Sequence, residues 1–339
     1  MATSRPFLFL LLAALTNMAS AQPIIIAHRG ASGYLPEHTL AAKAMAHAME
    51  ADYIEQDVVL SRDSIPLVLH DIHLDSTTDV EQRFPGRARK DGRYYAADFD
   101  LAEIRQLRVH ERTRHNQDGS PEAAYPQRFP LGPGLLSIPT LREEIALISG
   151  LDRSRGRSTG LYIELKAPNW HHRQGLDITR AVMTVLRETG YDQRVDQVYL
   201  QCFDDATLRR LRSEYRTALP LIQLIGDNGW KEDTDADYDY MMTDNGLAEI
   251  AEYAAGIGPW IRQIYTGTDA QGAPQLTDLV QRAQARGLLV HPYTFRRDEL
   301  PQGIEDFDQL LDIFVNRAGV DGLFTDFPDL VRDYLDRAR

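Results

Sequence analysis

Short apolar runs alternate along the chain with longer segments of helical periodicity. The runs lie at residues 24–26, 53–59, 161–163, 198–200, 221–225, 256–258, 288–290 and 322–324. The helical segments lie at 39–50, 140–149, 176–189, 205–216, 246–255, 275–286, 304–318 and 328–338. Strand-then-helix alternation predicts a parallel sheet with helical crossovers. Eight such units predict a (β/α)8 TIM barrel, and a doubly wound open sheet is the alternative that periodicity alone leaves open.

One region, residues 75–137, interrupts this alternation. It contains "FPGRARKDGRYYAADFD" and "DGSPEAAYPQRFPLGPG", which are rich in Pro, Gly, Arg and Tyr and hold no long periodic segment. A region of this length is too long for an ordinary barrel loop. We therefore expect a small inserted subdomain after the second strand, packed over the mouth of the barrel.

Residues 1–21 are typical of a secretory signal peptide. Arg5 precedes the apolar stretch 7–15, and Ala21 ends a tripeptide of small residues that suits a signal peptidase. The apolar stretch is too short to span a bilayer. The sequence therefore predicts an exported protein of residues 22–339. It shows no cysteine for a lipid anchor at the cleavage site and no later run long enough to form a stable membrane anchor.

The composition is that of a globular protein, with 43% hydrophobic and 26% charged residues. The formal net charge is −13, so the chain has no electrostatic basis for binding nucleic acid or an anionic membrane. An anionic substrate would need a local cluster of cations or a metal ion. Cys202 is the only cysteine, which rules out an intramolecular disulfide. The oligomeric state stays open, and the sequence is compatible with a homodimer.

Polar residues recur where the predicted strands end, and barrel enzymes build their active sites at that face. In chain order these residues are His28, Arg29, Glu55, Asp57, His70, Asp71, Glu164, Lys166, Gln201, Gln223, His291, Tyr293, Thr325 and Asp326. Glu55 and Asp57 are two residues apart, as are Glu164 and Lys166, so each pair points to one side of the sheet. We expect these side chains to meet at the barrel mouth.

Three of these residues are carboxylates that would repel one another in an apolar barrel mouth. Burying Glu55, Asp57 and Glu164 together is costly without a partner, and a divalent cation would offset that cost. Oxygen ligands suit Ca²⁺ or Mg²⁺ better than zinc. The alternative, which charge alone leaves open, is ion pairing with Arg29 and Lys166 and no metal.

His28 and His70 are the candidates for proton transfer, because histidine titrates near neutrality. Two histidines beside a carboxylate cluster and Arg29 favour an acid/base pair over isolated structural hydrogen-bonding roles. A metal ion, an arginine and a lysine around two histidines form a site suited to a phosphate ester.

The chain as a whole resembles the glycerophosphodiester phosphodiesterase family, most closely its periplasmic bacterial branch. The resemblance rests on an ordered set of motifs, "HRGASGYLPEHTL", "DYIEQDVVLSRD", "LVLHD", "YIELKAP", "YLQCFD", "VHPYT" and "GLFTDFPD". The insertion sequence "RFPGRARKDGRYYAADF" is also typical of that branch. The resemblance implies a (β/α)8 barrel that hydrolyses glycerophosphodiesters, such as glycerophosphocholine and glycerophosphoethanolamine, to sn-glycerol 3-phosphate and an alcohol in the periplasm.

The resemblance also implies roles for single residues. His28 and His70 match the family's general acid/base histidines, and Arg29 and Lys166 match residues that contact the phosphate. The implied metal ligands are Glu55, Asp57 and Glu164, which bind calcium in the periplasmic branch. Within the loop after the first strand, Glu37 is expected to orient Arg29, whereas for His38 we favour a structural role in capping the next helix with Thr39.

Two other functions stay open at this point. The first is a lysophospholipase D or sphingomyelinase D on the same barrel, which would need an apolar groove for an acyl chain. The Tyr- and Arg-rich insertion looks more polar than such a groove. The second is a secreted binding protein that keeps the barrel without catalysis, which would predict a broken set of site residues. The sequence also leaves open whether water or the substrate's own glycerol hydroxyl attacks phosphorus.

Overall fold

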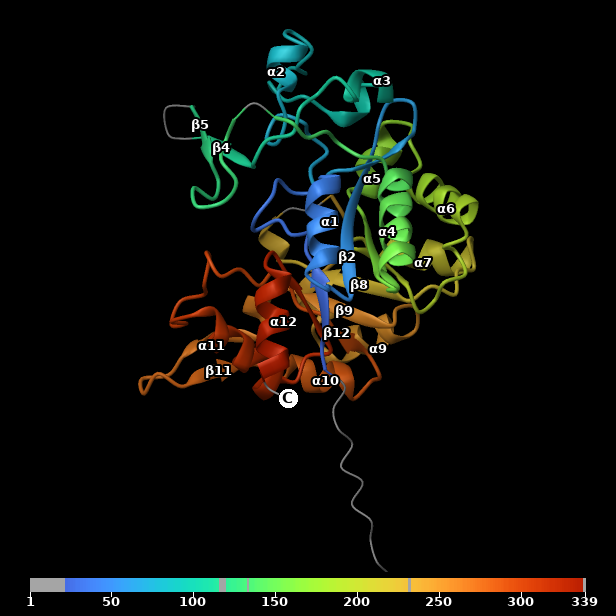
Figure 1. Ribbon diagram of the computed structural model, residues 1–339. Helices are drawn as coiled ribbons and strands as arrows, with labels where there is room; N and C mark the ends of the chain where they lie inside the picture. The colour runs from blue at the N-terminus through green and yellow to red at the C-terminus, as the bar shows by residue number, and fades with distance from the viewer. Residues whose placement is uncertain (1–21, 116–119, 133, 231–232, 338–339) are drawn as a thin grey trace, which may run out of the picture.

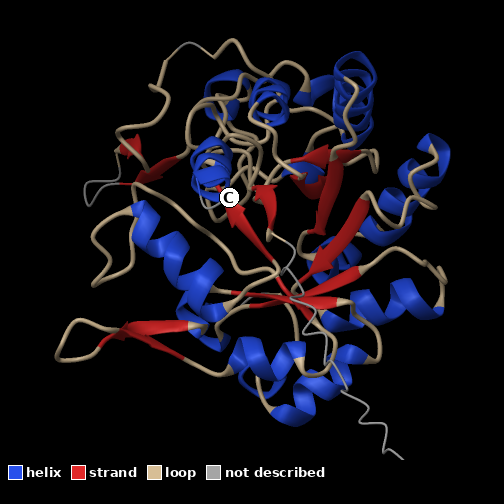
Figure 2. Cartoon of the chain, turned by 60° about the horizontal axis from the view of Figure 1, so that its bottom comes forward, coloured by secondary structure: helices blue, strands red, loops and turns tan. Residues whose placement is uncertain are grey.

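The computed structural model describes residues 22–115, 120–132, 134–230 and 233–337. Its centre is a parallel sheet that curves into a nearly closed barrel with helices around it (Figure 1, Figure 2). The barrel strands are β1 (Ile24–Ala27), β2 (Tyr53–Leu60), β6 (Gly160–Leu165), β7 (Val198–Cys202), β8 (Leu221–Ile225), β9 (Gly256–Pro259), β12 (Leu289–Val290) and β13 (Gly322–Thr325). The predicted (β/α)8 barrel is confirmed.

Backbone hydrogen bonds decide between the barrel and the open sheet. The sheet order is β12-β9-β8-β7-β6-β2-β1-β13, so β12 and β13 lie at its two ends. These ends meet, because the Asp321 amide donates to the Val290 carbonyl at 3.1 Å and the Phe324 amide donates to the Pro292 carbonyl at 3.0 Å. The sheet therefore closes on itself, and the open doubly wound alternative is wrong.

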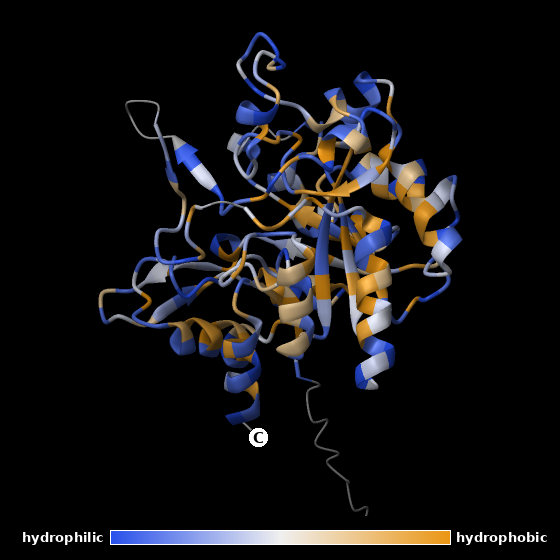
Figure 3. Cartoon of the chain, turned by 45° about the horizontal axis from the view of Figure 1, so that its top comes forward, coloured by the Kyte–Doolittle hydropathy of each residue, from blue (hydrophilic) through white to orange (hydrophobic). Residues whose placement is uncertain are grey.

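The surrounding helices are amphipathic, and their apolar faces lie against the strands (Figure 3). They are α1 (Leu40–Ala48), α4 (Leu141–Arg155), α5 (Pro168–Arg173), α6 (Ile178–Thr189), α7 (Asp205–Ser213), α8 (Tyr238–Met241), α9 (Asp244–Ala251), α10 (Leu279–Gln284), α11 (Phe307–Asp312) with the π-helical turn η4 (Ile313–Ala318), and α12 (Pro328–Arg337). Single 3-10 turns are η2 (Asn228–Trp230) and η3 (Ile261–Gln263). The predicted helix at 275–286 is too long. Residues 275 and 276 instead belong to β11 (Pro274–Leu276), which pairs with β10 (Tyr265–Thr268) in an antiparallel hairpin.

Segment 75–137 lies between β3 (Pro66–Val68), which pairs antiparallel with β2, and helix α4. It holds the short elements α2 (Val80–Arg83), η1 (Ala96–Asp98), α3 (Leu101–Ile104), β4 (Thr113–His115) and β5 (Pro121–Ala123), which Figure 1 shows together at one end of the barrel. Apolar residues of the segment, such as Val80, Phe99 and Ile104, form a cluster with Val59 and Leu67 that is distinct from the main core. Its role in restricting access to the site stays a prediction.

The barrel interior changes character along its axis. Ile26, Tyr162, Ile222 and Phe324 form a buried apolar cluster inside the barrel. Two residues further along β6, Glu164 lies directly opposite Asp57 of β2 and opposite Gln201 of β7. The strand register thus brings polar side chains into one layer above an apolar layer.

Among the described residues, none of the helices combines the length and the apolar character that crossing a bilayer requires. The predicted signal peptide, residues 1–21, lies outside the described residues. Export to the periplasm therefore stays a prediction of the sequence.

Candidate active site

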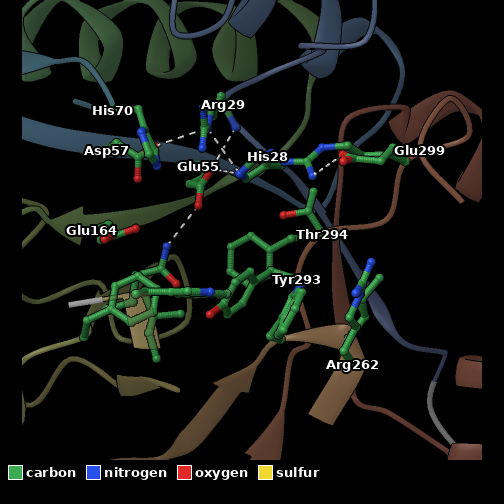
Figure 4. Close-up of a pocket in the computed structure, with 18 of the residues that line it drawn as sticks. His28, Arg29, Glu55, Asp57, His70, Glu164, Arg262, Tyr293, Thr294 and Glu299 are labelled. Atoms are coloured by element: carbon green, nitrogen blue, oxygen red, sulfur yellow. Dashed lines mark hydrogen bonds and ion pairs between the residues drawn. The ribbon is translucent and has the colours of Figure 1, made fainter. Parts of the chain in front are cut away.

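A cavity of about 340 Å³ opens at the carboxyl ends of the barrel strands. Figure 4 shows its polar side, where His28, Arg29, Glu55, Asp57 and His70 lie together. Glu164, Lys166 and Gln201 complete this side, so the cavity contains all seven residues that the sequence assigned to catalysis, substrate binding and metal binding. The position fits the active-site face of a barrel enzyme. We call this space the site cavity.

The loop after β1 has a backbone shape that fixes two of these residues. Arg29 has φ 58 and Gly30 has φ 89, conformations that L side chains rarely adopt. A Cβ on Gly30 would lie 2.9 Å from the carbonyl carbon of Ala42 in α1, so only glycine fits there. The turn aims the Arg29 amide at the carboxylate of Glu55, to which it donates at 2.8 Å. The loop therefore links β1 to β2 at the site itself.

The three predicted metal ligands form one cluster. Oxygen atoms of Glu55, Asp57 and Glu164 lie within 4.8 Å of one another, and all three residues are buried. Burial raises the pKa of Glu55 well above its usual value, with repulsion from Asp57 adding to the effect. Burial likewise raises the pKa of Glu164 to about 8, against the opposing charge of Lys166. Asp57 differs, because the adjacent His38 holds its pKa well below the usual value in spite of burial. The polypeptide alone therefore leaves Glu55 and Glu164 short of positive charge.

The donor set fits a divalent cation. Asp57 Oδ1 is buried and has no hydrogen-bond partner in the structure, which is costly unless a cation binds it. Lys166 pairs with Glu164 at 2.8 Å, and Arg29 Nε lies 3.6 Å from Asp57, so the predicted ion pairs exist but do not use this oxygen. Carboxylate oxygens in this number suit Ca²⁺ or Mg²⁺. The cluster can hold a metal ion, whose identity the donor set leaves open between these two.

Each candidate acid/base histidine is held by an aspartate. His28 Nδ1 donates to Asp326 Oδ1 at 2.6 Å, and His70 Nδ1 donates to Asp71 Oδ1 at 2.6 Å. An ionised carboxylate can only accept, so Nε2 is the nitrogen left for proton transfer on both rings. Arg29 Nε lies 3.2 Å from Nε2 of His28.

The electrostatics of the two histidines differ from those of histidine in water. Burial and, second, the positive charge of Arg29 lower the pKa of His28 to about 4, against the opposing charge of Asp326. The same two causes lower the pKa of His70 to about 4. At neutral pH the protein without substrate therefore holds both imidazoles neutral, although free histidine titrates close to neutrality.

Glu37 and His38 both belong to the site, which corrects the interpretation of His38. Glu37 accepts from Arg29 Nη1 at 3.0 Å, so its predicted role in orienting Arg29 is confirmed. Thr39 alone caps α1, by accepting from the Ala42 amide. His38 instead directs its Nε2 at Asp57 Oδ2, 2.8 Å away, while its φ of 60 turns it inward. It supports a predicted metal ligand and is not a helix cap.

Behind His38 lies a buried chain of charges. Lys43 Nζ is fully buried, 3.1 Å from His38 Nδ1 and 3.4 Å from Glu144, and it also donates to the Glu55 carbonyl. Groups of this kind orient metal ligands from the second layer. This chain therefore fixes Asp57 through its Oδ2 atom.

The chain behind Asp57 leads to a prediction. We expect His38→Ala to weaken binding of a divalent cation, with calcium as the probe, about 10–100-fold, because outer-layer partners of metal ligands typically contribute that much. Isothermal titration calorimetry with CaCl₂ would measure it. His172→Ala, at an exposed position on α5, is the matched control and should bind calcium like the unaltered protein. Equal affinities for both variants would contradict this role of His38.

Several site residues were not given roles from the sequence. Asp71 and Asp326 were placed at strand ends, but only the fold shows which histidine each one contacts. Gln201 donates to Glu55 Oε1 at 3.1 Å. Adjacency to His70 is a signal that could have identified Asp71, whereas Asp326 lies 298 residues from His28 and no local pattern connects them.

The other side of the site cavity is apolar and aromatic. Its lining residues there include Phe203, Leu224, Trp230, Trp260, Ile261, Leu300, Pro301 and Phe324. Trp230 and Trp260 pack edge to face with ring centroids 5.1 Å apart. These residues come from the loops and strand ends of the barrel, and none comes from segment 75–137, which is why the polar composition of that segment did not reveal them. A substrate can thus place a charged group at one side and a less polar group at the other.

Comparisons with known proteins agree with this arrangement. The model of the "Glycerophosphoryl diester phosphodiesterase family" matches residues 28–330. The chain is 43% identical over 338 residues to a glycerophosphodiester phosphodiesterase of Haemophilus influenzae, covering 94% of this chain and 93% of the relative. It is 36% identical over 332 residues to one of Treponema pallidum, with 94% and 93% covered. A phosphodiesterase of Oleispira antarctica, solved in complex with the product sn-glycerol-3-phosphate, has the same fold, with a TM-score of 0.61. It is 22% identical in sequence, and the match covers 93% of this chain and 97% of that one.

Proposed function

Because the chain belongs to the glycerophosphoryl diester phosphodiesterase family and is a glycerophosphodiester-hydrolysing enzyme, we propose that it cleaves small diesters by metal-dependent acid/base catalysis with two histidines. The proposed substrates are diesters such as glycerophosphocholine and glycerophosphoethanolamine, and the products are sn-glycerol 3-phosphate and an alcohol. One observation carries this proposal. The two imidazoles that aspartates hold at Nδ1 line the same cavity as Arg29, Lys166 and the carboxylate cluster.

The cations of the cavity bind the phosphate in this proposal. Arg29 is kept in place by Glu37, and Lys166 lies between Glu164 and His70, with its Nζ 3.4 Å from Nε2 of His70. Positive groups fixed in this way stabilise charge on the phosphoryl oxygens as the transition state forms. A divalent cation held by Glu55, Asp57 and Glu164, calcium first and magnesium as the alternative, would add Lewis-acid polarisation of the phosphoryl group.

The two histidines move the protons. One imidazole removes a proton from the attacking oxygen at Nε2, and the other donates a proton from Nε2 to the leaving alcohol oxygen. The attacking group is water, or the glycerol hydroxyl next to phosphorus followed by hydrolysis of a cyclic phosphate, and both routes use the same residues. Since both imidazoles are neutral before substrate binds, the acid takes up its proton together with the anionic substrate, whose charge favours the imidazolium form.

The size of the site cavity supports a small substrate. A volume of about 340 Å³ is at the lower end of the range for small-molecule pockets. The Oleispira phosphodiesterase holds sn-glycerol-3-phosphate, the product that we propose for this enzyme. The aromatic wall around Trp230 and Trp260 would contact the alcohol part of the diester, where rings of this kind attract a choline or ethanolamine cation.

The same aromatic wall favours a second candidate activity. An apolar groove is what a lysophospholipase D or sphingomyelinase D needs for its acyl chain, and the residues around Leu300 supply an apolar surface at the mouth. The small volume argues against a deeply bound chain. A binding protein without catalysis is the least supported alternative, because every predicted site residue lies in the cavity.

A direct assay separates these activities. The purified protein with calcium is offered glycerophosphocholine, glycerophosphoethanolamine, lysophosphatidylcholine or sphingomyelin, and phosphorus NMR identifies the products. We expect sn-glycerol 3-phosphate from the first two substrates, with kcat/KM at least about tenfold higher than for either lipid. A preference for lysophosphatidylcholine would support the second candidate activity, and no turnover of any substrate would support the binding protein.

We also propose that the enzyme acts in the periplasm, because residues 1–21 have the pattern of a cleaved export signal. Mass spectrometry of the exported protein should find a chain that begins at Gln22. A chain retained in the cytoplasm with residues 1–21 attached would contradict this location.

A further inference from the structure

The aspartates that hold the two histidines each have a second oxygen, and segment 75–137 supplies an arginine to both. Arg128 Nη2 donates to Asp326 Oδ2 at 2.7 Å. Arg112 Nη1 donates to Asp71 Oδ2 at 2.7 Å. Each histidine is therefore the first member of a His–Asp–Arg chain. The histidines and aspartates come from barrel loops, whereas both arginines come from the segment.

The His28 chain is buried throughout. The Asp326 side chain is 2% exposed and the Arg128 side chain is 5% exposed. Arg128 is itself fixed by two hydrogen bonds to Asp298, at 2.8 and 3.0 Å, and by the ring of Tyr125, 3.7 Å from its guanidinium carbon. Arg296 Nε also donates to Asp326 Oδ2, at 2.8 Å.

The His70 chain connects to the phosphate-binding side of the site. Arg112 makes two hydrogen bonds to Glu37, at 2.9 and 2.6 Å, besides its bond to Asp71. Glu37 in turn accepts from Arg29. Ser76, at the start of the segment, also donates to Asp71 Oδ2, at 2.8 Å. One guanidinium thus fixes the partners of both His70 and Arg29.

The side-chain hydrogen bonds of these two arginines serve the site and not the fold of the segment. The side-chain hydrogen bonds that the structure gives Arg128 go to Asp298, Asp326 and the Ser32 carbonyl, and those of Arg112 go to Glu37 and Asp71. All of these acceptors lie outside residues 75–137. Arg89 differs, because its ion pair is with Asp98 inside the segment, its guanidinium lies over the ring of Tyr95, and its hydrogen bond outside the segment goes to Gln174, which does not line the site cavity.

We propose that Arg112 and Arg128 are positioning residues for catalysis, and that segment 75–137 thereby completes the active site. This inference rests on the proposed two-histidine chemistry. Without Arg128 the second oxygen of Asp326 keeps, among the described residues, only the bond from Arg296, and without Arg112 that of Asp71 keeps only the bond from Ser76. Each carboxylate then rotates more freely, and its imidazole loses orientation. Each guanidinium places two donors on another carboxylate, Asp298 for Arg128 and Glu37 for Arg112, and this rigid grip holds one further N–H against the second oxygen of the aspartate. Nε2 of each ring then stays directed into the site cavity.

Arg128→Gln is the sharper of the two tests, because Arg112 also acts on Arg29 through Glu37. We expect kcat on glycerophosphocholine to fall about 10–100-fold, the usual effect of removing an outer partner from a functional group. KM and calcium affinity should change by less than about threefold, since Arg128 does not contact the carboxylate cluster in the structure. Arg128→Lys should recover only part of the loss, because lysine keeps the charge without the fork.

Arg89→Gln is the matched control, since it also removes a guanidinium that binds an aspartate and covers a tyrosine ring. Its kcat should stay within about twofold of the unaltered enzyme. A thermal melt of each variant shows whether the fold is kept. If Arg89→Gln lowers kcat as much as Arg128→Gln does, the effect comes from general loosening of the segment and the inference is wrong.

A double-mutant cycle links Arg128 to His28. In a His28→Ala background the further change Arg128→Gln should cost less than about twofold, because its only catalytic effect passes through His28. In a His70→Ala background it should keep its full effect. Equal losses in both backgrounds, or no loss in the unaltered enzyme, would overturn the inference. Failure of the unaltered enzyme to hydrolyse any glycerophosphodiester would instead remove the proposed function, so the two failures are distinguishable.

Discussion

His28→Ala and His70→Ala should each lower kcat on glycerophosphocholine by about 10²–10⁴-fold, the usual contribution of a general acid or base. Both rings line the site cavity, and each is held at Nδ1 by an aspartate, so each can exchange a proton only at Nε2. KM and calcium affinity should change little, because neither imidazole belongs to the carboxylate cluster. Steady-state kinetics and calcium calorimetry measure these quantities, with His172→Ala as the control.

The leaving group separates the acid from the base. An activated alcohol such as p-nitrophenol leaves without protonation, so a p-nitrophenyl diester should restore the rate of only the variant that lacks the acid. If neither variant is selectively restored, the division of roles is wrong although both residues belong to the site. If both variants keep the turnover of the unaltered enzyme on glycerophosphocholine, two-histidine catalysis is excluded.

Removal of the metal ion should abolish turnover and leave the barrel folded. The carboxylate cluster lies in the polar layer at the cavity, whereas the interior of the barrel is closed by an apolar cluster around Tyr162. Protein treated with a chelator should keep its circular dichroism spectrum and regain activity when CaCl₂ is added, or MgCl₂ if magnesium is the native ion. Full activity after chelation would contradict a metal-dependent mechanism.

Calcium binding by this cluster should depend on pH in a defined direction. Burial raises the pKa of Glu164 to about 8, so below that pH the ion must displace a proton from the cluster. Affinity should therefore fall as the pH is lowered from 9 to 6, and binding should release protons in that range. Calorimetry in two buffers of different ionisation enthalpy measures the release. Glu252→Gln, at an exposed position on α9's carboxyl end, should not change the pattern, whereas Asp57→Asn should remove binding.

The barrel and the polar layer of its site follow from local patterns. Alternation of buried strands and amphipathic helices repeats eight times, and a spacing of two residues puts Glu55 and Asp57 on one face of β2 whatever the rest of the chain does. The prediction of a helix at 275–286 was wrong at its amino-terminal end for a local reason. Residues 274–276 pair with β10 in a hairpin, and the helical periodicity of the side chains does not predict this backbone pairing.

Contacts between distant segments could not be read in the same way. The role of His38 depends on an inward backbone turn and on the position of Asp57, and a helix-cap pattern at Thr39 concealed both. The two tryptophans of the aromatic wall, Trp230 and Trp260, lie outside every motif that the sequence analysis used. The polar composition of segment 75–137 instead favoured a polar cavity mouth.

The sequence by itself determined the strand-and-helix order, the identity of the acid/base and metal-ligand candidates, and their place at the strand ends, because these depend on periodicity and on residues near one another in the chain. Only the tertiary structure decided which aspartate holds which histidine, and that Arg112 binds Asp71 whereas Arg128 binds Asp326. Closure of the barrel brings Asp326 to His28 across 298 residues, and the path of segment 75–137 places its two guanidiniums. Such contacts depend on where complete helices, strands and loops pack against one another, and a sequence pattern a few residues long does not predict that packing.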